Sequence, residues 1–472
     1  MRVLDEAPRT ALAASDGLLD VTSQTAFRDY FCCPAPFAAI RPSTALSEEA
    51  GYFRFGGAIC YGRRPGSDPV RRATDGLTDL STSATCGPEG VSLPFDLAEV
   101  LRNLREERYP QEPYLEWMTG SGTLRQFYYF VRPVLPVGVR RHIQRIPLSD
   151  WRRILFPAWP VDVTVETLME SVMAMVLKAS GGEIPFVWFW PNGASSAMIV
   201  THDVEGAPGG DFCDALMTID DSFGIKSSFQ VVPEGRRALT DEMVGRIREQ
   251  GFEVNVHDLN HDGHLFASRE QFLERAQRIN AHAERLGSRG FRSGSMYRQL
   301  DWFDALSFSY DMSVPNAAHL EPQRGGCCTV MPYFLGKMVE LPLTTVQDYS
   351  LFHILGDYTI GLWQQQAEQI TSRNGLITVL THPDYLIEER ALAVYADLLS
   401  YLTRLRDERN IWMALPAEVD RWWRSRHQMT VVPHGRSWRI EGPDSHRARL
   451  AYARLEGNRV VYRVEPPRGA IG

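Results

Sequence analysis

Two acidic residues and two histidines follow apolar runs in the middle of this chain. Asp203 and Glu205 lie in the stretch Thr201–Glu205 that follows the run Ala197–Val200, and His257 and His261 follow a second apolar run. Histidine nitrogens and carboxylate oxygens are the usual ligands of a catalytic divalent metal. A separate carboxylate can take a proton from the attacking water. This set of residue types therefore predicts a mononuclear metal hydrolase.

The spacing of the two acids fits a strand. Side chains alternate along a strand, so Asp203 and Glu205 would share one face and reach one site. One of them would bind a metal while the other acts as the base. The simpler alternative is a structural acid that caps the next helix.

The two histidines stand four residues apart. On a helix or helical turn this spacing puts His257 and His261 on one face, where both can hold one metal. An HxxxH pair alone is more often a surface or core pair. Its position after the predicted strand Glu253–Val256 favours the metal interpretation, and His264 is a weaker third candidate ligand.

Two further residues end predicted strands. Arg292 follows Gly290-Phe291, where a guanidinium can orient a carboxylate and keep its pKa low. His382 follows Leu376–Leu380 and could protonate a leaving nitrogen. A surface ion pair and a structural histidine are the alternatives for these two residues.

Two aspartates are candidates for orienting these groups. Asp311 and Asp348 each follow a later predicted strand, and either could hold Arg292 or His382. Loop aspartates are more often turn formers, so each is a weak candidate by itself.

Short apolar segments alternate with amphipathic helices between about residues 195 and 428. This alternation predicts a parallel α/β sheet or barrel, whose strand ends gather at one edge. The expected strands are Ala197–Val200, Ser227–Val232, Glu253–Val256, Gly290–Arg292, Phe308–Tyr310, Val339–Leu343 and Leu376–Leu380. The expected helices are Asp211–Phe223, Asp241–Gln250, Ser268–Leu286, Thr359–Ser372 and Glu388–Asp407.

Different patterns flank this region, so we expect three parts: 1–194, 195–428 and 429–472. The first is a mixed, aromatic-rich α+β region with a buried helix near its end, for which Thr164 is the expected N-cap and Gly181 the C′ residue. The last alternates polar and apolar residues and predicts a small β unit.

Composition narrows the function classes. The net charge of −8 argues against nucleic acid as the main partner, because phosphate binding needs a basic surface. The 7 cysteines lack a disulfide pattern and are expected as buried or free thiols. Neither a signal peptide nor an apolar run long enough to span a membrane is visible, so we expect a cytoplasmic protein. Its oligomeric state is not predictable.

Arginines and aromatic residues gather in the segment 124–154. One interpretation is a patch that contacts an anionic membrane surface. We favour a packed connecting segment, because Pro133 and Pro136 prevent a long amphipathic helix.

The ordered motifs resemble those of the NodB-like polysaccharide deacetylases over about residues 195–425. Thr201-His202-Asp203-Val204-Glu205 resembles the first motif, and His257-Asp258-Leu259-Asn260-His261 resembles the second. Arg292-Ser293-Gly294 and Leu380-Thr381-His382 resemble two later ones. Val204 and Gly294 depart from the family pattern, which usually has an aspartate and a proline there.

The resemblance implies a distorted (β/α)7 barrel that removes acetyl groups from N-acetylated sugars with a divalent metal, most often zinc. Glu205, His257 and His261 would hold the metal, and Asp203 would be the base. The reverse assignment, with Asp203 as the ligand, stays open. His382 would protonate the leaving amine, while Arg292 orients Asp203 and Asp311 is a further catalytic candidate.

The expected substrate is an acetylated sugar in a polysaccharide, an oligosaccharide or a lipid-linked precursor. A hydrolase of small non-sugar amides would use the same site. A barrel that only binds carbohydrate is the non-enzymatic alternative, and Val204 in place of an acid is its support. The joint presence of His257, His261, Arg292 and His382 favours an enzyme.

Overall fold

The computed structural model describes residues 22–42, 45–66, 68–74, 76–110, 151–234 and 240–466. The arginine-rich segment predicted at 124–154 lies outside this part except for its last four residues. Within the described ranges, no helix has the length and apolar character needed to cross a membrane.

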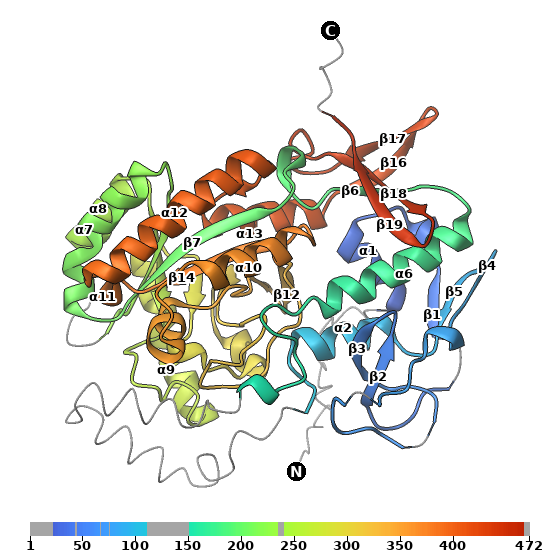
Figure 1. Ribbon diagram of the computed structural model, residues 1–472, viewed down its shortest axis with the longest axis horizontal. Coiled ribbons are helices and arrows are strands. Elements are labelled where there is room, and N and C mark those ends of the chain that lie inside the picture. The colour runs from blue at the N-terminus through green and yellow to red at the C-terminus, as the bar shows by residue number, and fades with distance from the viewer. Residues whose placement is uncertain are drawn as a thin grey trace, which may run out of the picture.

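Seven parallel strands form the centre of the protein (Figure 1). From one edge to the other their order is β13-β11-β10-β9-β8-β7-β14, so neighbours in the sheet are mostly neighbours in the sequence. This is the curled half-barrel of an α/β protein, and the predicted fold class is confirmed. The strands are β7 (Ala197–Val204), β8 (Ser228–Val231), β9 (Glu253–His257), β10 (Gly290–Arg292), β11 (Tyr310–Asp311), β13 (Met338–Glu340) and β14 (Leu376–Thr381).

Two short strands complete this sheet. β12 (Tyr333–Leu335) runs antiparallel to β13 at the edge, and β15 (Trp412–Met413) runs parallel to the start of β7. Within the described residues β13 and β14 do not pair. Side chains bridge this gap instead, because the hydroxyls of Thr344 and Thr345 each donate to a carbonyl of β14 at 2.8 Å. The barrel is therefore distorted at this seam.

Helices cover the outer face of the sheet. Met198 and Val200 of β7 point to this face and share one apolar cluster with Leu216, Ile279 and Leu398 of the helices. The predicted helices lie within a few residues of their expected ends. They are α7 (Ala207–Ser222), α8 (Asp241–Glu249), α9 (Arg269–Leu286), α10 (Gly361–Thr371) and α12 (Glu389–Arg409), with α11 (Pro383–Leu386) and α13 (Pro416–His427) after β14.

The apolar cluster on the inner face of the sheet continues into the N-terminal region. Ile199, Tyr310 and Leu341 belong to the same buried cluster as Phe53 and Leu168. The region consists of α1 (Ser23–Phe31), β1 (Ile40–Pro42), β2 (Gly51–Phe55), β3 (Ala58–Gly62), β4 (Thr85–Gly87), β5 (Gly90–Leu93), α2 (Leu97–Arg105) and α6 (Thr164–Ser180).

The predicted helix α6 is present, but its expected N-cap is wrong. Thr164 is already the first helical residue, and Val163 before it supplies no side-chain cap. The carboxylate of Asp162 takes this role, because it accepts a hydrogen bond from the Thr164 N–H at 2.8 Å. Gly181 ends the helix with a φ of 66°, a conformation that favours glycine.

The C-terminal strands form two hairpins. β16 (Thr430–His434) pairs with β17 (Ser437–Glu441), and β18 (Leu450–Glu456) pairs with β19 (Arg459–Val464). The second hairpin is joined by β6 (Ile184–Val187), which comes from the residues that precede the barrel. The region that precedes the barrel and the C-terminal hairpin therefore share a sheet. Of the seven cysteines only Cys86 is exposed, and all are free thiols.

Candidate metal centre

Three side chains at neighbouring strand ends form a group that could hold a metal ion. Glu205 follows β7, His257 is the last residue of β9, and His261 lies in the loop after it; one ligand atom from each lies within 4.8 Å of the others. The Oε1 atom of Glu205 lies 3.0 Å from Nε2 of His261 and 3.7 Å from Nε2 of His257. The predicted ligand residues are thus close together.

The HxxxH pair does not lie on a helix, which corrects the expected local structure. His257 ends a strand, and the chain then turns through Asp258 and His261, whose φ angles are 56° and 53°. These left-handed conformations are uncommon for residues with a side chain and often mark functional sites. A sharp turn therefore brings the two imidazoles together, with their ring centroids 5.0 Å apart.

The buried nitrogens of this group fit a metal. Nδ1 of His257 lies 3.2 Å from the Arg292 carbonyl, which can only accept, so Nδ1 carries the hydrogen and Nε2 has a free lone pair. Within the described residues, the Nε2 atoms of His257 and His261 are buried without a properly aligned hydrogen bond. Two imidazoles and one carboxylate are a common donor set for catalytic zinc.

The carboxylate and the imidazoles of the group stabilise one another's charged forms. Burial would raise the pKa of Glu205, but His261, His257 and His382 outweigh it and hold that pKa well below its usual range. Burial would lower the pKa of His261, yet Glu205 raises it to about 9. The carboxylate is therefore ionised and surrounded by nitrogen atoms.

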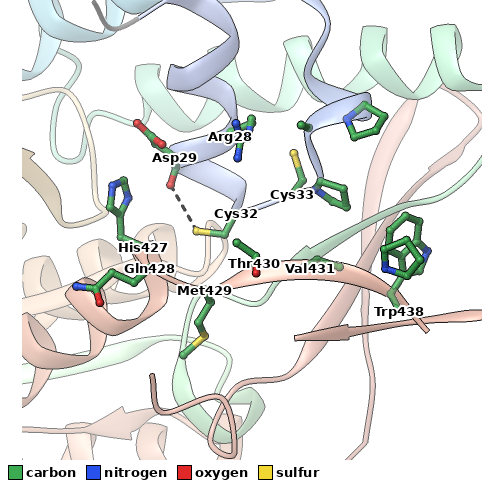
Figure 2. A pocket seen from close by; sticks show the side chains of 14 residues that line it. Arg28, Asp29, Cys32, Cys33, His427, Gln428, Met429, Thr430, Val431 and Trp438 are labelled. Carbon is green, nitrogen blue, oxygen red and sulfur yellow. Dashed lines mark hydrogen bonds between the residues drawn. The ribbon is translucent and has the colours of Figure 1, made fainter. Parts of the chain in front are cut away.

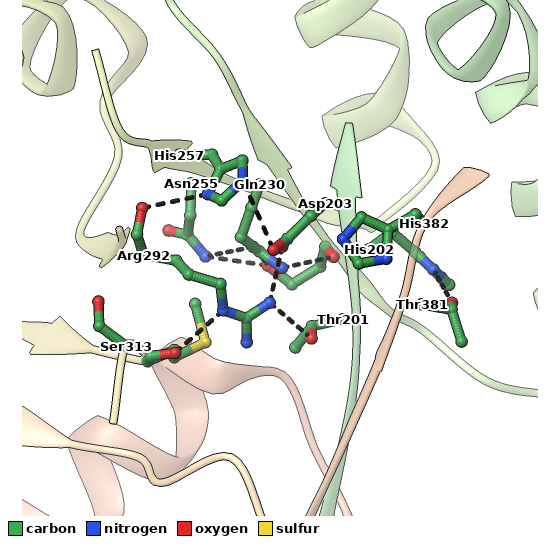
Figure 3. A network of polar contacts seen from close by, with 12 residues as sticks. Thr201, His202, Asp203, Gln230, Asn255, His257, Arg292, Ser313, Thr381 and His382 are labelled. Carbon is green, nitrogen blue, oxygen red and sulfur yellow. Dashed lines mark hydrogen bonds and ion pairs between the residues drawn. The ribbon is translucent and has the colours of Figure 1, made fainter. Parts of the chain in front are cut away.

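Asp203 lies beside this group and is held by Arg292 (Figure 3). Nη1 of Arg292 donates to Oδ1 of Asp203 at 2.7 Å, and Oδ2 lies 3.6 Å from Nε2 of His257. Burial would raise the pKa of Asp203, but Arg292, His257 and His382 lower it below its usual value. The Arg292 guanidinium is itself fixed by the Met312 carbonyl at 3.0 Å and the Thr201 hydroxyl at 3.0 Å.

His382 is oriented by Asp348, one of the two aspartates proposed for this task. Nδ1 of His382 lies 2.7 Å from Oδ1 of Asp348, whose Oδ2 accepts the His382 backbone N–H at 2.7 Å. Nε2 lies 3.6 Å from Oε1 of Glu205. Burial would lower the pKa of His382, but Asp348 and Glu205 raise it to about 10. The Asp348 carboxylate therefore favours the protonated imidazolium form of the ring, whose Nε2 faces the metal-ligand group.

Asp311 does not join the site, contrary to expectation. Its side chain accepts from the Ser313 hydroxyl at 2.7 Å and from the Ser313 N–H at 3.1 Å. Asp311 pairs with Phe291 of β10 in the register of the sheet, so these two side chains point to the same face. Arg292 is the next residue after Phe291 and therefore points to the opposite face. Among the described residues nothing links Asp311 directly to Arg292 or His382.

Two other histidines lie outside the metal-ligand group. His264, the weaker ligand candidate, has Nδ1 3.7 Å from Asp262 Oδ1 and does not belong to the group. His202, within the first motif, points to the helical face, where it contacts the Thr381 hydroxyl at 2.9 Å and Asp220 at 3.1 Å. Asp220 was not predicted from the sequence as a partner of His202. An acid in the apolar stripe of α7 is the signal that would have indicated it.

A cavity of about 380 Å³ lies apart from these residues, between α1 and the hairpin β16–β17 (Figure 2). Asp29, Cys33, His427 and Trp438 are among its lining residues. None of the residues that line it belongs to the candidate metal centre.

Comparisons with known proteins give similarity in structure only. No family model matches the chain, and no curated protein matches it in sequence. A solved structure from Mycobacterium smegmatis, described as a polysaccharide deacetylase, is 18% identical over 50% of this chain and 93% of that one, with a TM-score of 0.41. A protein of the same description from Pseudomonas aeruginosa PAO1 is 13% identical over 50% and 92%, with a TM-score of 0.39. The Puue allantoinase is 12% identical over 50% and 92%, with a TM-score of 0.38.

Proposed function

We propose that this chain is a divalent-metal-dependent hydrolase that removes an acetyl group from a sugar nitrogen. The substrate would be a polysaccharide, an oligosaccharide or a lipid-linked precursor. One observation carries the proposal: a Glu-His-His group, an aspartate paired with Arg292 and a histidine paired with Asp348 lie together at one edge of the sheet.

Glu205, His257 and His261 are the residues that would hold the metal, and zinc suits their nitrogen and oxygen atoms. When bound, such an ion supplies Lewis acidity, which polarises a carbonyl and lowers the pKa of a water molecule. Since one ligand atom of each side chain already lies within 4.8 Å of the others, little rearrangement is needed to bind it.

Asp203 would act as the general base. Its Oδ1 is occupied by Arg292, while Oδ2 faces the metal-ligand group 3.6 Å from His257. A carboxylate kept ionised in this way can take a proton from the attacking water. Arg292 orients it and keeps it in the proton-accepting form.

His382 would act as the general acid. Asp348 holds its Nδ1, so the Nε2–H is the proton that can be donated. This proton would pass to the nitrogen as the bond between nitrogen and acyl carbon breaks. The amine then leaves as a neutral group, which makes amide cleavage easier.

Metal content tests this proposal first. Wild-type protein would be compared with His257→Ala and Glu205→Ala by elemental analysis. We expect about one metal per chain in the wild type and its loss in both variants. Retention in Glu205→Ala with loss in His257→Ala would transfer the ligand role to Asp203.

Substrate assays then decide the reaction. We expect acetate release from N-acetylated oligosaccharides by the metal-loaded wild type. Activity on small cyclic amides alone would contradict the sugar substrate while leaving the chemistry intact. A wild type that binds no metal even after reconstitution would indicate a barrel that only binds carbohydrate.

A further inference from the structure

Glu107 lies outside the barrel, just after α2, yet it reaches the loop that follows β10. We propose that Glu107 is a positioning residue for the metal site: through Arg298 it holds the loop Gly294–Met296 against the ligand His261. This inference rests on the metal site proposed above, and it gives the N-terminal region a role there.

The link between Glu107 and Arg298 is a buried ion pair. The side chain of Arg298 is 0% exposed and that of Glu107 is 5% exposed. Nε of Arg298 donates to Oε2 of Glu107 at 2.5 Å, and Nη2 donates to Oε1. Two parallel hydrogen bonds fix the direction of the guanidinium as well as its position.

Arg298 uses its remaining donors on backbone carbonyls. Nη1 donates to the Met296 carbonyl at 2.8 Å, and Nη2 also donates to the Arg324 carbonyl at 3.1 Å. The first of these bonds holds the end of the loop Gly294–Met296. If the guanidinium lost its carboxylate partner, the direction of this bond would no longer be fixed.

The loop needs such a hold because its backbone is strained. Ser295 and Met296 have φ angles of 55° and 52°, so two consecutive residues with side chains are in the left-handed region. Residues of this kind keep that conformation only where their surroundings impose it. The bond from Arg298 to the Met296 carbonyl acts directly on the strained residues.

The same loop touches the metal-ligand segment. A Cβ atom on Gly294 would lie 3.0 Å from Cδ2 of His261 and 2.4 Å from Oδ2 of Asp258. The loop backbone therefore forms the surface on which the His261 ring rests. A shift of the loop would change the position of this ring relative to Glu205 and His257.

Glu107 is itself firmly placed. Besides Arg298, its Oε1 accepts the Gly326 N–H at 2.5 Å, and the nearby Tyr109 hydroxyl donates to the Gly326 carbonyl at 2.5 Å. The segment that carries Glu107 is thus attached to a second barrel loop. The anchor can therefore resist movement of the loop that it holds.

Arg298→Lys is the most informative variant. Lysine keeps the positive charge opposite Glu107, but its single nitrogen cannot reproduce the fork that also reaches Met296. We expect Co²⁺ affinity about 10-fold weaker than in the wild type, as is common when an outer partner of a metal site is lost. The absorption spectrum of bound Co²⁺ should also change, because it reports ligand geometry. Glu107→Gln should change both in the same direction.

Glu170→Gln is the matched control. Glu170 of α6 also links the N-terminal region to the barrel, through Arg373 at 2.5 Å, but it does not contact the loop after β10. We expect wild-type Co²⁺ affinity and spectrum in this variant. Because Glu170 is about one-third exposed, this control tests the loss of a link between the two regions, and thermal melts of all three variants measure stability separately.

Three results would contradict the role of Glu107 or the proposed function, each in a different way. If the wild type binds Co²⁺ and Arg298→Lys matches its affinity and spectrum, this inference is wrong and the metal site stands. If the wild type binds no Co²⁺, the proposed function itself fails. If neither Arg298→Lys nor Glu107→Gln folds, as judged by circular dichroism, the pair supports the whole fold and the inference is also wrong.

Discussion

Asp203 and Glu205 differ in what surrounds their carboxylates. Oδ1 of Asp203 accepts a hydrogen bond from Nη1 of Arg292 at 2.7 Å. In contrast, Oε1 of Glu205 lies within 3.7 Å of the Nε2 atoms of three histidines. Those histidines are His257, His261 and His382. A carboxylate among imidazoles suits metal binding, and one held by a guanidinium suits proton transfer. The two acids therefore have separate tasks in our proposal.

Asp203→Asn tests this separation. The amide keeps an oxygen for Arg292 but cannot take a proton from water. We expect kcat to fall by a factor of about 10² to 10⁴ while the metal content stays at the wild-type level. Steady-state kinetics and elemental analysis of the same preparation measure both quantities.

Asp311→Asn is its control. Burial raises the pKa of Asp311, and an asparagine there keeps an oxygen that can accept hydrogen bonds from Ser313. Because Asp311 points to the opposite face from Arg292, we expect near wild-type kcat. Loss of metal in Asp203→Asn would contradict our assignment and make Asp203 a ligand.

Strand length explains why the direction of the Asp203 side chain could be predicted and that of Asp311 could not. β7 spans 8 residues, so the alternation of its side chains puts Thr201 and Asp203 on one face. β11 has only 2 residues, Tyr310 and Asp311, and shows no alternation. Its register against β10 decides the direction of Asp311, and register depends on contacts between segments far apart in the sequence.

At the scale of elements, the turn after β9 was the least predictable feature of the site. The spacing of His257 and His261 is that of a helical face, yet a strand end and two left-handed residues bring them together. Asp258 and His261 are of types that adopt this conformation more readily than most, and Asn260 and Gly263 are common in turns, so the sequence signals a turn but not which side chains it brings together. In contrast, α9 and α12 were predicted closely, because long amphipathic patterns with end signals depend on local sequence.

Helix α6 carries a buried acid that makes stability depend on pH. Glu166 is 5% exposed; its Oε1 accepts hydrogen bonds from the Thr329 hydroxyl at 2.5 Å and the Val330 N–H at 3.3 Å. Burial raises the pKa of Glu166 from 4.5 to about 7. Between these pH values the folded protein keeps a proton that the unfolded chain releases. The free energy of unfolding contributed by Glu166 therefore falls as pH rises through this window.

Glu166→Gln should remove this dependence. The amide keeps an oxygen for Thr329 and Val330 and cannot ionise. We expect the free energy of unfolding of Glu166→Gln minus that of the wild type to rise by about 3 kcal/mol from pH 4.5 to pH 7.5. This value follows from roughly 1.4 kcal/mol per unit of pKa shift. Urea titrations at both pH values measure the difference.

The control for this prediction lies one turn along the same helix. Glu170 is about one-third exposed, so its replacement by glutamine removes a charge without removing a buried acid. We expect no comparable change with pH for Glu170→Gln. A constant difference between Glu166→Gln and wild type at both pH values would show that Glu166 has an ordinary pKa.

At the scale of the molecule, the apolar cluster on the inner face of the barrel includes residues from outside it. Ile199, Tyr310, Met312 and Leu341 lie in one buried cluster with the N-terminal region. The sequence indicates three parts through changes of pattern. It does not reveal this packing, since an apolar strand residue looks the same whichever segment covers it. The sequence also does not reveal that β6 pairs with β18, because this pairing depends on contacts between segments far apart in the chain.

Excision of residues 195–428 tests how far the barrel depends on its surroundings. The excised chain would expose the inner cluster to water and lose the anchor that Glu107 provides. We expect helical circular dichroism without a cooperative thermal transition, and strong binding of a hydrophobic dye, as in a molten globule. Residues 22–466 serve as the control and should melt cooperatively. A cooperative transition of the excised barrel within about 5 °C of that control would contradict us, because the inner face would then need no cover.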